Sequence, residues 1–136
     1  MSSFRSSIGR SKAIVTGGNS GIGEAVAKRL AADGAQVLLV ARNRSELGRV
    51  AGQIRDAGGV ADYHSVDLAA PDAAQGVLQA AISFMGGIDI LVNCASQTHN
   101  GDFFELTDEL WEAAFAVKVF AAIRLCRAAW PAPRGR

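Results

Sequence analysis

The stretch that decides the fold is KAIVTGGNSGIG, residues 12–23, in which a short apolar run ends at a cluster of glycines. Apolar residues then recur at Ile22, Val26 and Leu30, which is the i, i+4, i+8 spacing of one helix face, and Gly34 follows as a helix C-terminus. The pattern therefore predicts a strand, a glycine-rich loop and a helix, in that order.

The rest of the chain repeats this alternation of strands and helices. Residues 37–40 form a continuous Val/Leu run, which is the composition of a strand buried on both faces of a parallel sheet. Further strands are expected over residues 60–66 and 88–92. The helices expected after these strands are one with Ser45 as its N-cap that ends at Gly58, one whose first residue is Pro71, and one over residues 107–129 that is apolar on most of its circumference. This βαβα pattern predicts an α/β fold.

Composition and charge exclude several classes of protein. The chain has 136 residues, of which 49% are hydrophobic, so it can build the core of one globular domain. Its 14 basic and 13 acidic side chains give a net charge of +1, which argues against a nucleic-acid partner held by bulk electrostatics. The most apolar stretch, residues 113–122, contains Lys118 and is far shorter than the roughly 20 residues that span a bilayer, so no membrane role is expected. Two cysteines are too few for a disulfide framework, and residues 1–12 lack the apolar region of a signal peptide, so we expect a cytoplasmic protein.

The glycine-rich loop lies where backbone N–H groups at a helix N-terminus meet a pyrophosphate. Gly17 lets the chain turn sharply, Gly21 lets the backbone approach phosphates without a Cβ, and Gly23 lets the helix pack close to the strand. The alternative is a glycine-rich turn without a ligand, which the T-G-x-x-x-G-x-G spacing in a βαβ frame disfavours. The candidate phosphate-binding residues are Gly17, Asn19, Ser20, Gly21, Ile22 and Gly23.

This spacing resembles that of the short-chain dehydrogenase/reductase family, and the resemblance runs over residues 12–130. Asp67 and Leu68 resemble the end of the family's third strand. The resemblance implies that Asp67 contacts the adenine ring of a dinucleotide and that Leu68 lies beside it.

A second match to the family follows the predicted fourth strand. Asn93, Cys94 and Ala95 resemble the N-N-A-G segment, from which Cys94 and Ser96 depart, and the resemblance implies that this segment lines the cofactor site. The residues themselves allow a simpler alternative, in which Asp67 and Asn93 are turn residues that bond their own backbone.

The end of the second predicted strand bears on which cofactor is bound. Ala41 lies roughly 20 residues beyond the phosphate loop, where an NAD site would place an acid to bind the ribose 2′-hydroxyl. That acid is absent, and Arg42 and Asn43 follow directly. A guanidinium is always charged and can bond a 2′-phosphate in bidentate fashion, so the sequence favours NADP over NAD, with Arg42 and Asn43 in the site. The alternative is that Arg42 is a solvated surface arginine.

The catalytic residues that the resemblance implies are a Tyr and a Lys four residues later, and no such pair can be written here. The single tyrosine is Tyr63, which is followed four residues later by Asp67 and lies in a predicted strand, where a packing role is expected. Lys118 stands where many members of the family carry an Asn of the proton relay; either it is a functional amine or it extends to the surface. His64 and His99 lack metal-ligand spacing, so no zinc site is expected.

These features predict a Rossmann-like, doubly wound parallel sheet with helices on both faces, which stops after four strands in the order 3-2-1-4. Residues 12–130 would form the NAD(P)-binding domain, between a polar segment over residues 1–11 and an irregular tail over residues 131–136. The resemblance implies an oxidoreductase that transfers hydride between NADP(H) and a carbonyl or alcohol substrate, with its catalytic half missing. The alternative is a non-catalytic dinucleotide-binding remnant or truncation product, and the isolated chain is expected to be inactive.

The predicted surface also suggests that the chain associates with itself. The helix over residues 107–129 is apolar on more sides than one sheet face can cover. The strand over residues 88–92 would form an open sheet edge, which is a template for pairing with another chain. We therefore expect self-association through this helix and this edge.

Overall fold

The computed structural model describes residues 7–97 and 101–135, so His99 and the outermost residues of the predicted amino-terminal segment and tail lie outside the described residues. The elements follow in the order β1 Lys12–Thr16, α2 Gly21–Ala32, β2 Gln36–Ala41, α3 Arg44–Asp56, β3 Val60–Ser65, α4 Ala73–Met85, β4 Ile90–Asn93, η1 Phe103–Glu105, α5 Asp108–Phe115, η2 Ala116–Phe120 and α6 Ala121–Ala129.

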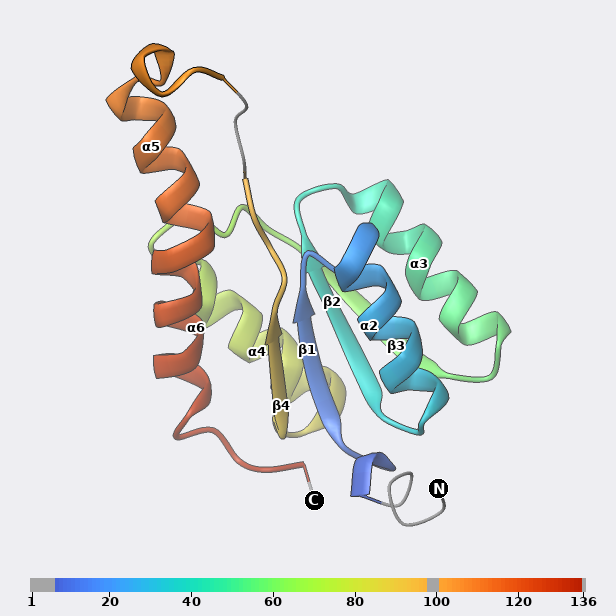
Figure 1. Ribbon diagram of the computed structural model, residues 1–136. Helices are drawn as coiled ribbons and strands as arrows, with labels where there is room; N and C mark the ends of the chain where they lie inside the picture. Colours follow the sequence, from blue (N-terminus) through green and yellow to red (C-terminus); the bar gives the residue numbers. More distant parts are fainter. Residues whose placement is uncertain (1–6, 98–100, 136) are drawn as a thin grey trace.

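The four strands form one parallel sheet in the order β3-β2-β1-β4, as the sequence predicted (Figure 1). Val15 in β1 pairs with Leu39 in β2 on one side and with Val92 in β4 on the other. The strand order reverses between β1 and β4, and in open α/β sheets the loops at such a point separate to leave a crevice.

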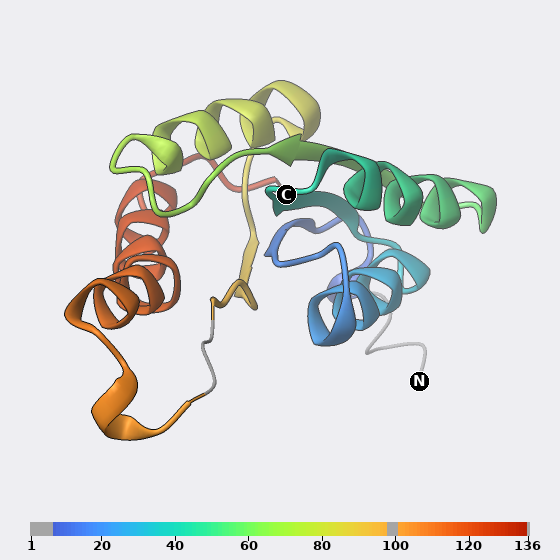
Figure 2. The same cartoon turned by 90° about the horizontal axis from the view of Figure 1, so that it is seen from above.

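Helices cover both faces of this sheet, with α2 and α3 on one side and α4 and α6 on the other (Figure 2). Successive residues of β1 supply the two cores, because side chains of a strand alternate between its faces. Ile14 belongs to the core that contains Val77 of α4, whereas Val15 belongs to the core that contains Val50 of α3. Each fully buried side chain of this size stabilises the fold by about 1.5–3 kcal/mol relative to an exposed one.

The predicted long helix is present, but it is not a uniform α-helix. Thr107 is its N-cap and accepts a hydrogen bond from the backbone N–H of Leu110 (3.3 Å). A π-helical segment, η2, separates α5 from α6, and such a segment holds one more residue per turn than an α-helix. In this stretch only Ala121 and Leu125, both in α6, are buried.

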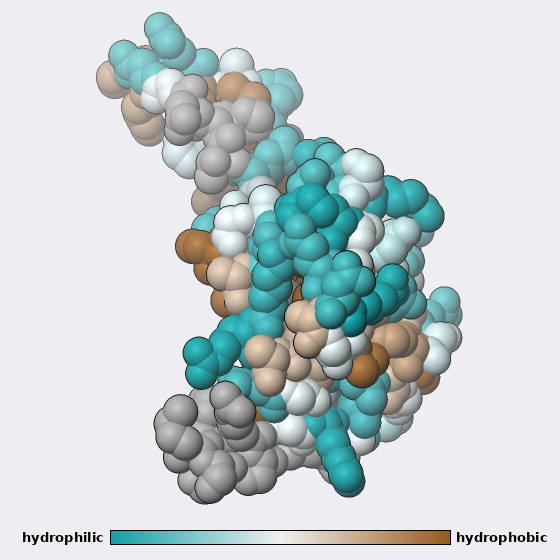
Figure 3. Space-filling model, turned by 90° about the vertical axis from the view of Figure 1, so that its right-hand side faces the viewer, coloured by the Kyte–Doolittle hydropathy of each residue, from teal (hydrophilic) through white to brown (hydrophobic). Residues whose placement is uncertain are grey.

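Five large apolar side chains of this helix are exposed, as its pattern predicted. The exposed fractions lie between 36% and 50% for Trp111, Phe115, Val119, Phe120 and Ile123. The amino-terminal part of the helix, α5, extends beyond the strands of the sheet (Figure 1). By contrast, the face formed by α2 and α3 is mainly hydrophilic (Figure 3).

Two predicted helix starts are wrong by two residues. The N-cap of α3 is Asn43 rather than Ser45, because the Asn43 side chain accepts the backbone N–H of Glu46 (3.1 Å). The Ser45 hydroxyl lies inside the first turn and donates to Asn43 Oδ1 (2.9 Å). Helix α4 begins at Ala73 rather than at Pro71, which lies in the preceding turn.

The tail after α6 returns to the start of β4 and covers part of the predicted open edge. The backbone N–H of Ile88 donates to the Pro133 carbonyl (2.8 Å), and the N–H of Gly135 donates to Asp89 Oδ1 (2.9 Å). Lys12 Nζ donates to the Gly135 carbonyl (3.0 Å). Strand β4 itself begins only at Ile90, so the uncovered edge is shorter than expected.

Candidate functional site

The loops that follow the four strands surround a groove of about 460 Å³. Every cofactor-binding residue predicted from the sequence lines this groove except Asn93. The lining residues are Gly17, Asn19, Ser20, Gly21, Ile22, Gly23, Ala41, Arg42, Asn43, Val66, Asp67, Leu68, Cys94, Ala95, Ser96, Gln97 and Val117. The parallel sheet brings them together because the carboxyl ends of all its strands meet at one edge.

The glycine-rich loop is shaped by close backbone contacts. Gly17 has φ +67°, and a Cβ there would lie 2.9 Å from the backbone nitrogen of Ala95. A Cβ at Gly23 would overlap the carbonyl group of Gly17. Gly23 thus lets α2 pack close to the end of β1, and the positive φ of Gly17 accommodates the turn, as the spacing predicted. The close approach of the loop after β4 to Gly17 is a further contact.

Gly21 has a different role from these packing glycines. Its φ is +55°, and among the described residues nothing lies within 4 Å of the position that a Cβ would take. Because Gly21 begins α2 and lines the groove, bare backbone at the positive end of the helix dipole borders open space. This cradle fits the phosphate groups of a dinucleotide, which helix N-termini bind through backbone N–H groups.

Thr16 is a site residue that the sequence analysis did not identify. Its buried hydroxyl oxygen accepts hydrogen bonds from the backbone N–H groups of Cys94 (3.2 Å) and Ala95 (3.1 Å), and its hydroxyl donates to the Val92 carbonyl (3.4 Å). These bonds hold the loop after β4 against the end of β1. The available signal was a hydroxyl residue at the last position of an apolar strand, directly before Gly17.

The end of β2 forms a second wall of the groove. Arg42 is exposed, and the Ser65 hydroxyl holds its backbone by donating to its carbonyl (2.8 Å). Within the described residues Arg42 has no ion-pair partner, whereas the side-chain oxygen of Asn43, but not its Nδ2, takes part in capping α3. A guanidinium without a carboxylate partner at the groove can attract an anionic group.

The third wall follows β3. Asp67 lines the groove and also accepts the backbone N–H of Ala69 (3.0 Å), so the turn role considered for this residue is present. Leu68 lines the same wall but is almost fully buried in the core beneath it. This wall therefore offers the exposed carboxylate of Asp67 next to the buried apolar side chain of Leu68.

Three residues considered in the sequence analysis lie away from the groove. Asn93 is exposed, and its Nδ2 lies 3.9 Å from the Cys126 sulfur of α6. Lys118 is exposed in η2 and does not line the groove, although its neighbour Val117 does. Tyr63 packs against the core on the α2 and α3 side, which is the packing role expected for it.

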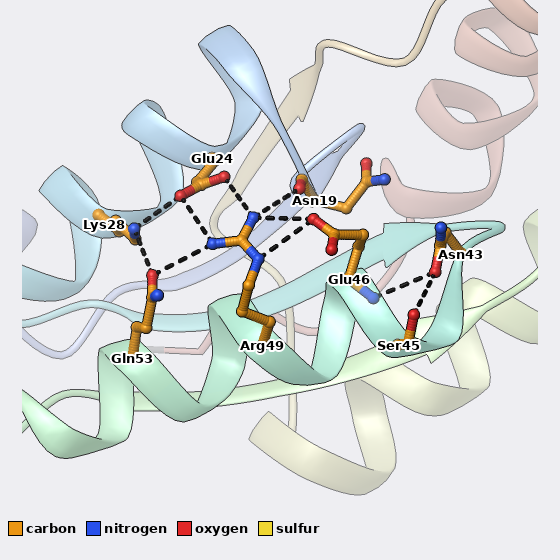
Figure 4. Close-up of polar contacts among 8 residues, drawn as sticks. All are labelled: Asn19, Glu24, Lys28, Asn43, Ser45, Glu46, Arg49 and Gln53. Atoms are coloured by element: carbon orange, nitrogen blue, oxygen red, sulfur yellow. Dashed lines mark hydrogen bonds and ion pairs between the residues drawn. The ribbon is translucent and has the colours of Figure 1, made fainter.

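A cluster of charges borders the amino-terminal end of α2 (Figure 4). Glu24, in the first turn of α2, accepts hydrogen bonds from Arg49 Nη2 (2.9 Å) and from Lys28 Nζ (2.6 Å). These two bonds lower the pKa of Glu24 to about 2, and the bonds to Glu24 and Glu46 raise the pKa of Arg49. The carboxylate of Glu24 is therefore charged at neutral pH and paired with two cations.

Two other kinds of site find no support in the described part of the chain. Residues 7–97 and 101–135 contain no group of three or more side chains that could hold a metal ion. None of the described helices is long and apolar enough to cross a bilayer.

The parallel sheet, the glycine-rich turn and the groove at the strand ends define a Rossmann-type α/β domain. A family model described as "short chain dehydrogenase" matches residues 11–136. The chain therefore belongs to the short-chain dehydrogenase family.

Known relatives agree with this assignment. An uncharacterized oxidoreductase of Staphylococcus epidermidis is 34% identical over 119 residues, which are 88% of this chain and 50% of that protein. The short-chain reductase protein NovJ of Streptomyces niveus is 35% identical over 114 residues, 84% of this chain and 44% of the relative. The chain thus spans half or less of the length of these relatives.

Solved structures show the same fold. L-sorbose reductase from Gluconobacter frateurii, described as complexed with NADPH and L-sorbose, matches with a TM-score of 0.85 and 36% identity, over 90% of this chain and 47% of that one. A short chain dehydrogenase from Burkholderia cenocepacia J2315 in complex with NADP matches with a TM-score of 0.86 and 36% identity, over 90% of this chain and 51% of that one.

Proposed function

We propose that the groove binds a nicotinamide dinucleotide, that NADP(H) is preferred over NAD(H), and that the chain is part of an oxidoreductase. The observation that carries this proposal is the cradle at Gly21, an open groove bordered by bare backbone at the start of a helix. Arg42 and the absence of an acid at Ala41 support the choice of NADP(H). The two similar structures described as complexes with NADPH or NADP support the same choice.

The proposal gives each wall of the groove a part of the dinucleotide. The glycine-rich loop and the first turn of α2 hold the pyrophosphate, and Arg42 with Asn43 holds the ribose 2′-phosphate. Asp67 and Leu68 hold the adenine, and Cys94 and Ala95 border the remaining part of the groove. When bound, NADPH supplies a hydride to a carbonyl carbon, and NADP⁺ accepts one from an alcohol.

A second candidate function is a dinucleotide-binding module without catalysis. The observation that favours it is the position of the single tyrosine, Tyr63, which packs against the core rather than lining the groove. No Y-x-x-x-K pair occurs in the 136 residues. The catalytic proposal therefore applies to a protein in which further residues complete the site, and we expect the isolated chain to bind cofactor without turnover.

Two further features of the protein are proposals of the same kind. The uncovered apolar side chains of α5 and η2 and the edge of β4 favour self-association. The small number of cysteines favours a cytoplasmic location.

The test of the proposed function is a fluorescence titration of the purified chain with NADPH and, separately, with NADH. We expect saturable binding of both and a lower Kd for NADPH. Adenosine 2′-monophosphate should compete with NADPH, because it carries the phosphate that distinguishes the two cofactors. The absence of saturable binding for either dinucleotide would contradict the proposal.

A further inference from the structure

Arg49 of α3 lies at the centre of a hydrogen-bond chain that joins two walls of the groove (Figure 4). Its Nη2 donates to the backbone carbonyl of Asn19 (3.3 Å), to Glu24 Oε1 (2.9 Å) and to Glu46 Oε2 (3.0 Å). The backbone N–H of Glu46 in turn donates to Asn43 Oδ1 (3.1 Å). Because Asn19 and Asn43 both line the groove, these hydrogen bonds connect the glycine-rich loop after β1 with the loop after β2.

The guanidinium group uses all three of its nitrogens in this arrangement. Besides the Nη2 contacts, Nε donates to Glu46 Oε2 (3.1 Å), and Nη1 lies 3.4 Å from both Glu24 Oε2 and Gln53 Oε1. Only a planar fork of donors can make these contacts at once, and the ammonium group of a lysine lacks that geometry. Arg49 therefore fixes the Asn19 carbonyl and two carboxylates together.

Glu24 creates an electrostatic problem for an anionic ligand. A carboxylate in the first turn of a helix interacts favourably with the helix dipole, but phosphates bind at the same end of the helix. An uncompensated charge on Glu24 would repel them. Arg49 and Lys28 are both bonded to this carboxylate, and the cluster of Glu24, Glu46, Lys28 and Arg49 carries two charges of each sign.

We propose that Arg49 is a positioning residue for dinucleotide binding, which fixes the phosphate loop through the Asn19 carbonyl and compensates the charge of Glu24. The inference rests on the proposed function, since it requires a dinucleotide in the groove. Arg49 itself is outside the groove lining and acts through Asn19 and Glu24. An ordinary ion pair between α2 and α3 would affect folding stability without favouring an anion in the groove.

The test is a set of NADPH titrations with the native chain, Arg49→Ala, Glu24→Gln and the double variant. We expect Arg49→Ala to raise the Kd for NADPH by roughly two- to fivefold, the range of a single partly exposed charge interaction. The double variant should recover much of this loss because the repelling charge is gone. The loss in Arg49→Ala should also shrink as salt rises from about 0.01 M to 0.5 M, because salt screens exposed charges.

Two controls separate charge compensation from a general effect on α3. Arg55→Ala removes another arginine of α3, which bonds the Ala61 carbonyl (2.9 Å) and Asp62 (3.4 Å) and does not line the groove. It should leave the NADPH affinity unchanged. Arg49→Lys keeps the charge without the planar fork, so its Kd should lie between those of the native chain and Arg49→Ala. Circular dichroism confirms that each variant is folded.

The possible results differ in what they refute. Native binding together with an unchanged Kd in Arg49→Ala overturns the role of Arg49 and leaves the proposed function standing. A loss in Arg49→Ala that neither Glu24→Gln nor salt relieves overturns charge compensation. A native chain that does not bind NADPH refutes the proposed function, and the inference with it.

Discussion

Replacing Arg42 by alanine tests the cofactor preference most directly. The structure places Arg42 in the groove wall at the end of β2, and only its backbone is held, through the Ser65 hydroxyl (2.8 Å). Its guanidinium has no carboxylate partner in the described part of the chain, so its charge is available to a ligand. We expect Arg42→Ala to weaken NADPH binding and to leave NADH binding unchanged.

The size of the effect follows from the exposure of this side chain. Hydrogen bonds to charged groups contribute about 1.5–3 kcal/mol, and each 1.4 kcal/mol changes a Kd about tenfold. Arg42 is exposed, so water screens the interaction and an ordered side chain loses rotamer freedom on binding. The expected loss therefore lies near the lower end of this range, at about tenfold.

The assay is a fluorescence titration with NADPH and NADH at fixed ionic strength. Arg44→Ala is the matched control, because Arg44 is an exposed arginine two residues further on that does not line the groove. Equal affinities for the two cofactors, both before and after the Arg42→Ala change, would refute the reasoning.

Four other outcomes are expected. The isolated chain should show no NADPH-dependent turnover of a panel of ketones and aldehydes, because the loss of a general acid alone lowers the rate by roughly 10²- to 10⁴-fold. The chain used in the assay should have a verified intact mass, and turnover at a rate usual for enzymes would contradict the expectation. Light scattering over a dilution series should show self-association through α5 and η2, whereas a monodisperse monomer at tens of micromolar, the order at which weak contacts form, would speak against it. Thr16→Val should lower the free energy of unfolding by about 1–3 kcal/mol, because the partly buried backbone N–H groups of Cys94 and Ala95 lose their acceptor. Thr16→Ser keeps a hydroxyl and should retain most of the native stability; urea unfolding measures both variants. The pKa of Glu24 is lowered from 4.5 to about 2, so the contribution of its ion pairs to stability is present above pH 4.5 and is lost as the pH falls toward 2. The difference in free energy of unfolding between the native chain and Glu24→Gln should therefore shrink over that pH interval. A difference that stays constant would contradict the lowered pKa of Glu24.

The sequence was sufficient to predict the sheet and most of the groove. Apolar runs that end at glycines and alternate with helical patterns predict alternating strands and helices. The strand order is the one typical of the doubly wound fold, and right-handed connections place helices on both faces of its sheet. Because the carboxyl ends of parallel strands share one edge, Gly21, Arg42 and Asp67 were expected to meet, and they do. Their binding to a dinucleotide remains a prediction.

Other features depend on contacts that a linear pattern does not contain. Thr16 bonds residues 78 and 79 positions further along the chain, and Asn93 lies beside a cysteine 33 positions away. The N-cap of α3 depended on where β2 ends, because Asn43 and Ser45 are both good capping residues. The hydrophobic pattern over residues 107–129 also does not reveal the π-helical segment η2, which holds one additional residue in its turn.

That additional residue gives η2 a tolerance to a change in length that a regular helix lacks. None of the residues of η2 is buried, so most single substitutions there should be tolerated. Removing one residue would leave the number of residues that a regular α-helix needs over the same stretch, so α6 would keep its orientation and Ala121 and Leu125 would stay in the core on the α4 side. Removing two residues would turn α6 by about 100° relative to α5, since each residue of an α-helix advances by that angle, and would rotate both side chains out of that core. A deletion of two residues within residues 116–120 should therefore be far more damaging than a deletion of one.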